Sequence, residues 1–293
     1  MQGETGIGKT TFVKKLLVDW SNLQEAKMDE EQEDALRKFD LILAVNLKEV
    51  SECQTFEEVI SRSRLFPKDE EKSVDDLLCY IRTNEDKVLL VFDGYDEYRT
   101  GSEAEKRYGS RNSSPIFEIF HRDILRHCTV LVTTRSSRGD EIRGLADIQA
   151  EITGFNERDR EDFMRKMLDS QTEVEGLLEF LRISNLNDLA RVPLLSLFFC
   201  LLWKEEKEKF LELTERKAKL YQAIVEHIML HCDRRHSSSK ASKLKETDYE
   251  ILAEIGKVAL AGLLKGDLVF EFGQLPETVR GEVGVIVGLF SIF

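Results

Sequence analysis

Apolar residues in the first half of the chain gather into short runs that are separated by longer amphipathic stretches. Near-continuous runs occupy residues 40–46, 87–92 and 129–134, and a weaker run covers 148–152. Runs of this kind are typical of strands that are buried on both faces of a parallel sheet. The pattern therefore predicts at least three buried parallel strands.

The stretches between these runs have the spacing of helices. The first has one apolar stripe, made of Phe12, Val13, Leu16, Leu17 and Trp20, and such a stripe can pack on a sheet. Further helices are predicted over 55–64, 73–82 and 116–126. Strands alternating with helices make β–α–β units, so residues 1–153 predict a three-layer α/β sandwich with its ligand at the carboxyl ends of the strands.

Beyond Gly154 the apolar period changes from that of a sheet to that of helices. Asn156, followed by Asp159, resembles a capping box and predicts a helix through Met167. Pro193 stands in the first turn of an apolar helix. The predicted helices cover 174–182, 194–203, 214–232 and 249–264, and a short strand is expected at 269–272. We expect residues 154–213 to form a small helical subdomain.

Composition narrows the function classes. The 293 residues are 42% apolar and carry a net charge of −13, which supports a real core and argues against a nucleic-acid-binding surface. The five cysteines are scattered and predict buried thiols in a reducing compartment. The longest apolar run, 194–203, is about half the length of a membrane span, so no span is expected.

Residues 3–10 match the phosphate-binding pattern G-x-x-x-x-G-K-[ST] at all four defining positions. In this pattern the loop backbone surrounds phosphate oxygens, the lysine reaches the β- and γ-phosphates, and the hydroxyl binds Mg²⁺. A glycine-rich turn with a chance Lys-Thr pair is the alternative. We expect the phosphates to be bound through Gly3, Thr5, Gly6, Ile7, Gly8, Lys9, Thr10 and Thr11, with Thr10 also binding Mg²⁺.

Only Met1 and Gln2 precede this loop, which is too few for the buried strand that normally comes before it. The chain also closes on an uncovered apolar run, 285–293. We therefore expect both ends to be cut within a longer protein.

Asp93 directly follows the second of the buried runs. This is where a phosphate-loop protein places the acid that holds Mg²⁺ through water. Gly94 allows the chain to turn Asp96 and Glu97 toward a γ-phosphate, where one of them can orient the attacking water. A solvated acidic turn at a strand end is the alternative.

Arg135 ends the next run, at the same predicted sheet edge. It can sense the charge of a γ-phosphate, or it can be a rim arginine that is paired with a nearby carboxylate. Both interpretations remain open at this point. The N/T-K-x-D pattern of guanine-specific switches has no match after a late strand, so ATP and ADP are the expected nucleotides.

Together these motifs resemble the NACHT domain, the nucleotide-binding switch of NOD-like receptors within the STAND class of P-loop NTPases. The similarity extends over nearly the whole chain. It is carried by Gly3–Thr11 with Trp20, Val88–Glu97, Val132–Arg135, Gly154–Asn156, Val192–Leu195 and Leu220–Tyr221.

The resemblance implies a partial winged-helix subdomain over 214–293 and an adenine site near Pro193. It implies that ADP holds a closed monomer and that ATP releases it for self-association, with slow hydrolysis as the reset. The output would be innate immune or cell-death signalling in the cytoplasm, through an adaptor bound by a further N-terminal domain.

Two alternatives remain. A turnover ATPase would need a catalytic acid directly after Asp93, where this chain has Gly94. The other alternative is a scaffold protein that has kept the fold but no longer binds the nucleotide. In the family the strand before the phosphate loop lies centrally, between the fourth and fifth strands, so its absence would leave unpaired backbone groups.

Overall fold

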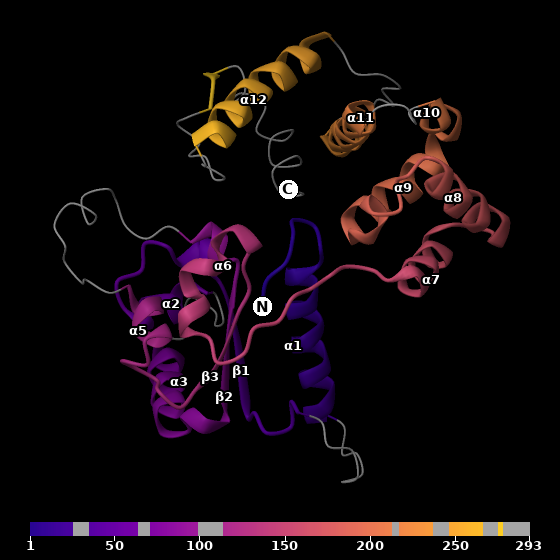
Figure 1. Ribbon diagram of the computed structural model, residues 1–293. Helices are drawn as coiled ribbons and strands as arrows, with labels where there is room; N and C mark the ends of the chain where they lie inside the picture. Colours follow the sequence, from indigo (N-terminus) through magenta and orange to yellow (C-terminus); the bar gives the residue numbers. More distant parts are fainter. Residues whose placement is uncertain are drawn as a thin grey trace. The chain divides into compact units, whose positions relative to one another are not determined.

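The computed structural model describes residues 1–25, 35–63, 71–98, 114–212, 217–236, 246–265 and 275–277. They belong to two compact units, Met1–Ile152 and Thr153–Phe293, and each is described by itself (Figure 1). The predicted strand at 269–272 and the closing apolar run at 285–293 lie outside the described residues.

The first unit is built on a parallel sheet of three strands. β1 (Leu41–Asn46), β2 (Val88–Asp93) and β3 (Thr129–Val132) lie in that order, with β2 in the centre. Five of the six residues of β2 are buried, because a central strand is covered on both faces. The three near-continuous apolar runs of the sequence are therefore confirmed as parallel strands.

Successive residues of each strand face opposite sides of the sheet. Leu90 and Phe92 pack with α2 (Phe56–Arg62), α3 (Glu71–Thr83) and α5 (Pro115–Phe120). Leu89 and Val91 pack with Val13 of α1 (Lys9–Glu25) on the other side. Figure 1 shows α1 apart from the other three helices, across the sheet. The predicted three-layer α/β sandwich is confirmed.

Met1 to Gly3 lie beside the continuation of β3. Gln2 forms parallel bridges with Thr134 on one side and Glu151 on the other. The Gly3 N–H donates to the Thr134 carbonyl at 3.2 Å, and the Ile152 N–H donates to the Gln2 carbonyl at 2.9 Å. The start of the phosphate loop is thus held on both sides. The weak run at 148–152 contributes an isolated bridge at Glu151 and no longer strand.

The helix predicted over 116–126 ends early, since α5 stops at Phe120. Arg122 and Leu125 adopt positive φ angles of 61° and 48°, which a right-handed helix excludes. The Arg122 guanidinium donates to the carbonyls of Cys128 at 2.6 Å and Arg126 at 3.3 Å. These two hydrogen bonds hold the turn that leads into β3.

In its described residues the second unit contains helices joined by turns and loops, and no β-strand. Asn156 accepts a hydrogen bond from the Asp159 N–H at 2.8 Å and caps the first helix, and Pro193 stands in the first turn of α9; both predictions are confirmed. Its helices are α7 (Glu157–Met167), α8 (Gln171–Ile183), α9 (Pro193–Glu205), α10 (Lys207–Glu212), α11 (Lys217–His236) and α12 (Glu246–Lys265).

One apolar core joins α7 to α11 in this unit, with Phe180, Phe199, Trp203 and Phe210 in ring contact. The division into a helical part at 154–213 and a winged-helix part at 214–293 stays a prediction. Over the described ranges, none of the helices has the length and apolar character needed to cross a membrane.

Candidate functional site

The phosphate loop connects the bridge at Gln2 to α1. Gly6 and Gly8 have φ angles of 72° and 106°, which side-chain-bearing residues rarely adopt. They turn the chain so that α1 begins at Lys9. Because the first N–H groups of a helix have no acceptor within it, the loop ends on backbone donors and the positive end of a helix dipole.

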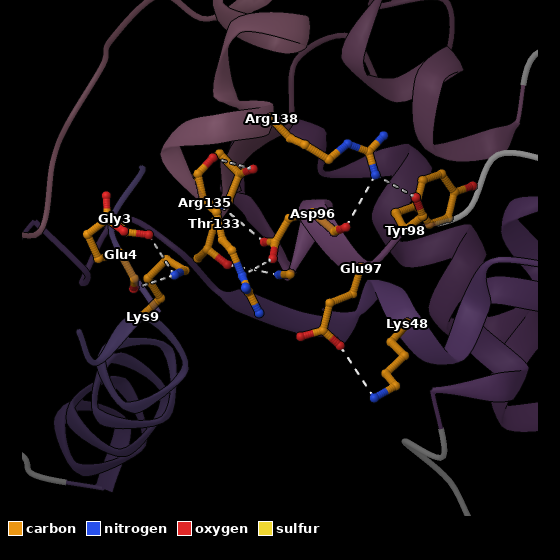
Figure 2. Close-up of polar contacts among 12 residues, drawn as sticks. Gly3, Glu4, Lys9, Lys48, Asp96, Glu97, Tyr98, Thr133, Arg135 and Arg138 are labelled. Atoms are coloured by element: carbon orange, nitrogen blue, oxygen red, sulfur yellow. Dashed lines mark hydrogen bonds and ion pairs between the residues drawn. The ribbon is translucent and has the colours of Figure 1, made fainter. Parts of the chain in front are cut away.

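Lys9 folds back over its own loop. Its Nζ donates to the carbonyls of Gly3 at 2.8 Å and Glu4 at 3.0 Å (Figure 2). Burial lowers the pKa of Lys9, the charge of Asp96 counteracts that shift, and the charge of Arg135 adds to it. A partly desolvated ammonium that contacts neutral carbonyls gains strongly from an anion, so the arrangement favours phosphate binding.

Asp93 ends β2 and accepts two hydroxyl hydrogen bonds. Thr10 Oγ1 donates to its Oδ2 at 2.7 Å, and Thr133 Oγ1 donates to its Oδ1 at 2.5 Å. The Thr133 hydroxyl oxygen in turn accepts a hydrogen bond from the Gly94 N–H at 2.9 Å. This contact orients the hydroxyl proton of Thr133 toward Asp93. The loop hydroxyl and the strand-end acid therefore lie together, as the sequence predicts for a Mg²⁺ site.

Gly94 has a φ of 82°, and the chain then folds into a short 3₁₀ turn, Tyr95–Glu97 (η3), which we call the acidic turn. The Tyr95 N–H donates to the Thr133 carbonyl at 2.9 Å. The acidic turn is thereby fixed over the end of β3.

Arg135 follows β3 and binds Asp96 of the acidic turn. Its Nε lies 2.7 Å from Asp96 Oδ2, and its backbone N–H donates to Asp96 Oδ1 at 3.1 Å (Figure 2). The Asp96 side chain is only 5% exposed, so this ion pair is largely buried. The pairing of Arg135 with a carboxylate is thus present, and its contact with a γ-phosphate stays a prediction.

Glu97, the other acid of the turn, faces a different cation. Lys48 Nζ, from the 3₁₀ turn Leu47–Val50 after β1, lies 3.5 Å from Glu97 Oε2. The Lys48 side chain is exposed and the Glu97 side chain is partly exposed, and ion pairs that are open to solvent contribute little stability. Glu97 is therefore held more loosely than Asp96.

Of the other predicted site residues, Ile7 is buried in the loop and Thr11 is exposed in the first turn of α1. Thr5 lies in the loop as well. Pro193 belongs to the second unit, and its place near an adenine stays a prediction.

Sequence reasoning assigned no role to Thr133 or Lys48, which contact Asp93 and Glu97. Thr133 is fully buried, and its only signal is a pair of threonines that closes an apolar run. Lys48 gave no signal, because its approach to Glu97 depends on β1 lying beside β2.

A family model described as "NACHT domain" matches residues 1–171. The chain belongs to the NACHT family. The matched range contains the phosphate loop, Asp93, the acidic turn and Arg135, so every residue of this edge lies inside the NACHT match.

Three curated relatives align with almost the whole chain. NLR family CARD domain-containing protein 4 of Xenopus tropicalis is 27% identical over 99% of this chain and 26% of its own length. Human nucleotide-binding oligomerization domain-containing protein 2 is 23% identical over 93% of this chain and 26% of its own length. Mouse NACHT, LRR and PYD domains-containing protein 10 is 24% identical over 92% of this chain and 37% of its own length. The chain thus spans about a quarter to a third of these relatives.

Proposed function

We propose that this NACHT domain is an ATP/ADP-binding signalling switch. The observation that carries the proposal is the meeting of four residues at one edge of the sheet. Lys9 and Thr10 come from the phosphate loop, Asp93 from the end of β2, and Arg135 from the end of β3. Ligands of parallel α/β sheets bind at this carboxyl edge.

The donor set at this edge fits a nucleotide with its metal ion. Lys9 and the N–H groups of the loop supply positive charge for phosphates. The hydroxyl of Thr10 and the carboxylate of Asp93 are the hard oxygen ligands that Mg²⁺ prefers, directly or through water. Bound there, the ion would neutralise charge on the β- and γ-phosphates. Adenine is the expected base.

Hydrolysis in this proposal is slow and resets the switch. In this structure Arg135 binds both carboxylate oxygens of Asp96, whereas the Glu97 carboxylate is open to solvent and is the acid that we assign to orienting a water. Since Glu97 is not rigidly fixed, a weak NTPase is the expected activity.

The signalling role rests on the family and on the name of one relative, human nucleotide-binding oligomerization domain-containing protein 2. We propose that ADP stabilises a closed monomer and that ATP stabilises a form that self-associates. A further N-terminal domain would then engage an adaptor in innate immune or cell-death signalling. We also propose a cytoplasmic location, where the thiols of Cys53, Cys79, Cys128 and Cys200 would stay reduced.

Calorimetric titration with ADP and with Mg²⁺–ATP tests the ligand. Lys9→Ala should abolish binding of both nucleotides, because it removes the charge in the loop. Lys14→Ala is the matched control, since Lys14 is an exposed lysine of the same helix. Unchanged affinity in Lys9→Ala would overturn the assignment of the phosphate site.

Light scattering coupled to size exclusion tests the switch. The protein should elute as a monomer with ADP and as a larger species with a non-hydrolysable ATP analogue. Binding of both nucleotides with the same mass in each would leave a nucleotide-binding protein without the proposed switch.

A further inference from the structure

Arg138 of α6 (Ser136–Ile142) holds the main chain of the acidic turn. Its Nη1 donates to the carbonyl of Asp96 at 3.2 Å and to the carbonyl of Tyr98 at 3.2 Å (Figure 2). One guanidinium therefore binds the acidic turn at Asp96 and the residue that directly follows the turn, Tyr98.

The guanidinium is itself fixed from two sides. Its Nε and Nη2 donate to Glu141 at 3.1 and 3.0 Å, and it lies 5.1 Å from the centroid of the Tyr95 ring. The Tyr95 hydroxyl donates to Glu141 at 3.1 Å. Burial first, and then the charge of Glu141, raise the pKa of Tyr95 to about 12, so the phenol keeps its proton for this bond. Arg138, Glu141 and Tyr95 make a closed set of contacts, which we call the turn clamp.

The turn clamp and the ion pair act on the same residue through different groups. Asp96 is held at its carboxylate by Arg135 and at its backbone carbonyl by Arg138, and both arginines come from one short segment after β3. If Arg135 turns toward a γ-phosphate, the buried carboxylate loses its nearest cation, which is costly. The backbone contacts of Arg138 do not depend on that exchange.

We propose that Arg138 is a positioning residue for triphosphate recognition, which keeps the acidic turn in place while Arg135 exchanges Asp96 for a γ-phosphate. This inference rests on the proposed nucleotide function. It assigns to Arg138 no contact with the nucleotide. Its effect should therefore fall on the discrimination between ATP and ADP and not on nucleotide binding as a whole.

Arg138→Gln tests the inference, with Arg138→Lys as the conservative variant. Arg122→Gln is the matched control, because Arg122 also donates to two carbonyls but lies before β3, at the opposite end of that strand. The measured quantity is the ratio of the dissociation constants for ADP and for a non-hydrolysable ATP analogue with Mg²⁺, obtained by fluorescence titration.

We expect Arg138→Gln to shift this ratio against the triphosphate by about tenfold, the range for loss of charge-assisted hydrogen bonds, with ADP affinity within about twofold of the parent. Arg138→Lys should restore part of the ratio, since it keeps the charge. Arg122→Gln should keep the parent ratio. An equal loss of both nucleotides in Arg138→Gln would overturn the inference and assign Arg138 a merely structural role.

A second readout needs no nucleotide. The Glu97 N–H donates to the Gly94 carbonyl at 3.0 Å, and the Tyr98 N–H donates to the Tyr95 carbonyl at 3.1 Å. Hydrogen exchange of these two amides should accelerate in Arg138→Gln but not in Arg122→Gln. Unchanged exchange would contradict the turn clamp. A parent protein that binds neither nucleotide overturns the proposed function and this inference with it. A parent that binds both, with an unchanged ratio in Arg138→Gln, overturns the inference alone.

Discussion

Thr10 and Asp93 are joined by a hydrogen bond of 2.7 Å across 83 residues of sequence. This bond connects the phosphate loop to the end of the central strand. Because Thr133 binds the other oxygen of the same carboxylate, three segments of the chain fix one acid. The geometry of the proposed Mg²⁺ site is therefore a property of the folded sheet and not of the loop alone.

Asp93→Asn should weaken Mg²⁺–ATP binding by about tenfold or more, the range found when residues that orient metal ligands are changed. Binding of ADP without Mg²⁺ should change much less, because that complex does not use the carboxylate. Titrations with and without Mg²⁺ measure both effects. Asp40→Asn is the control, since Asp40 precedes β1 and pairs with Lys87, which precedes β2, at the end of the sheet opposite Asp93. Equal losses for the two nucleotides would rule out the Mg²⁺ role.

Thr133→Val keeps the shape of the side chain but removes its hydroxyl. The Gly94 N–H then loses its acceptor and Asp93 loses a donor, so we expect a cost of about 1–3 kcal/mol in the free energy of unfolding. Urea denaturation measures it. The control is Thr129→Val, because Thr129 is exposed at the start of β3, the strand that Thr133 directly follows. A cost as small as that of the control would show that the buried hydroxyl is not needed.

Gly94→Ala tests the backbone of the acidic turn. No atom lies within 4 Å of the added Cβ, but the φ of +82° is strained for alanine, with a cost of about 1–2 kcal/mol. Gly144→Ala also meets no atom within 4 Å and carries no positive φ, so it should be neutral within about 0.5 kcal/mol. Equal unfolding free energies for the two variants would argue against the left-handed turn.

Cysteine reactivity reports on the two cores. Burial raises the pKa of Cys128 and of Cys200 to about 12, so at pH 8 their thiolate fraction is on the order of 10⁻⁴. Iodoacetamide should label exposed Cys79 in the native protein and leave both buried thiols unmodified, as peptide mass spectrometry can resolve. Rapid native labelling of Cys128 or Cys200 would contradict the packing around them.

Much of the fold could be predicted because its signals are local. The runs that form β1, β2 and β3 are apolar on both faces. The spacing of Asn156 and Asp159 predicts the N-terminal cap of α7. The phosphate loop and Asp93 follow from spacing along the chain. The early end of α5 could not be predicted. Arg122 and Leu125 adopt positive φ angles there, and no glycine in the sequence indicates such a turn.

Two partners of the acidic turn, Lys48 and Arg138, could not be predicted from the sequence for a different reason. Lys48 reaches Glu97 only because β1 is the neighbour of β2, and Arg138 reaches Asp96 only because α6 packs against the turn. Strand order and helix packing are tertiary facts. No pattern of residue types along the chain contains them.

The central claim is that this chain is a nucleotide switch, and the most direct measurement is of the nucleotide it carries. The purified protein is denatured and the released small molecules are identified by chromatography, with Lys9→Ala and Lys14→Ala treated alike. The account predicts ADP from the parent and from Lys14→Ala, and none from Lys9→Ala. A folded parent that releases no nucleotide and takes up none would contradict it and favour a scaffold that has kept the fold without the ligand.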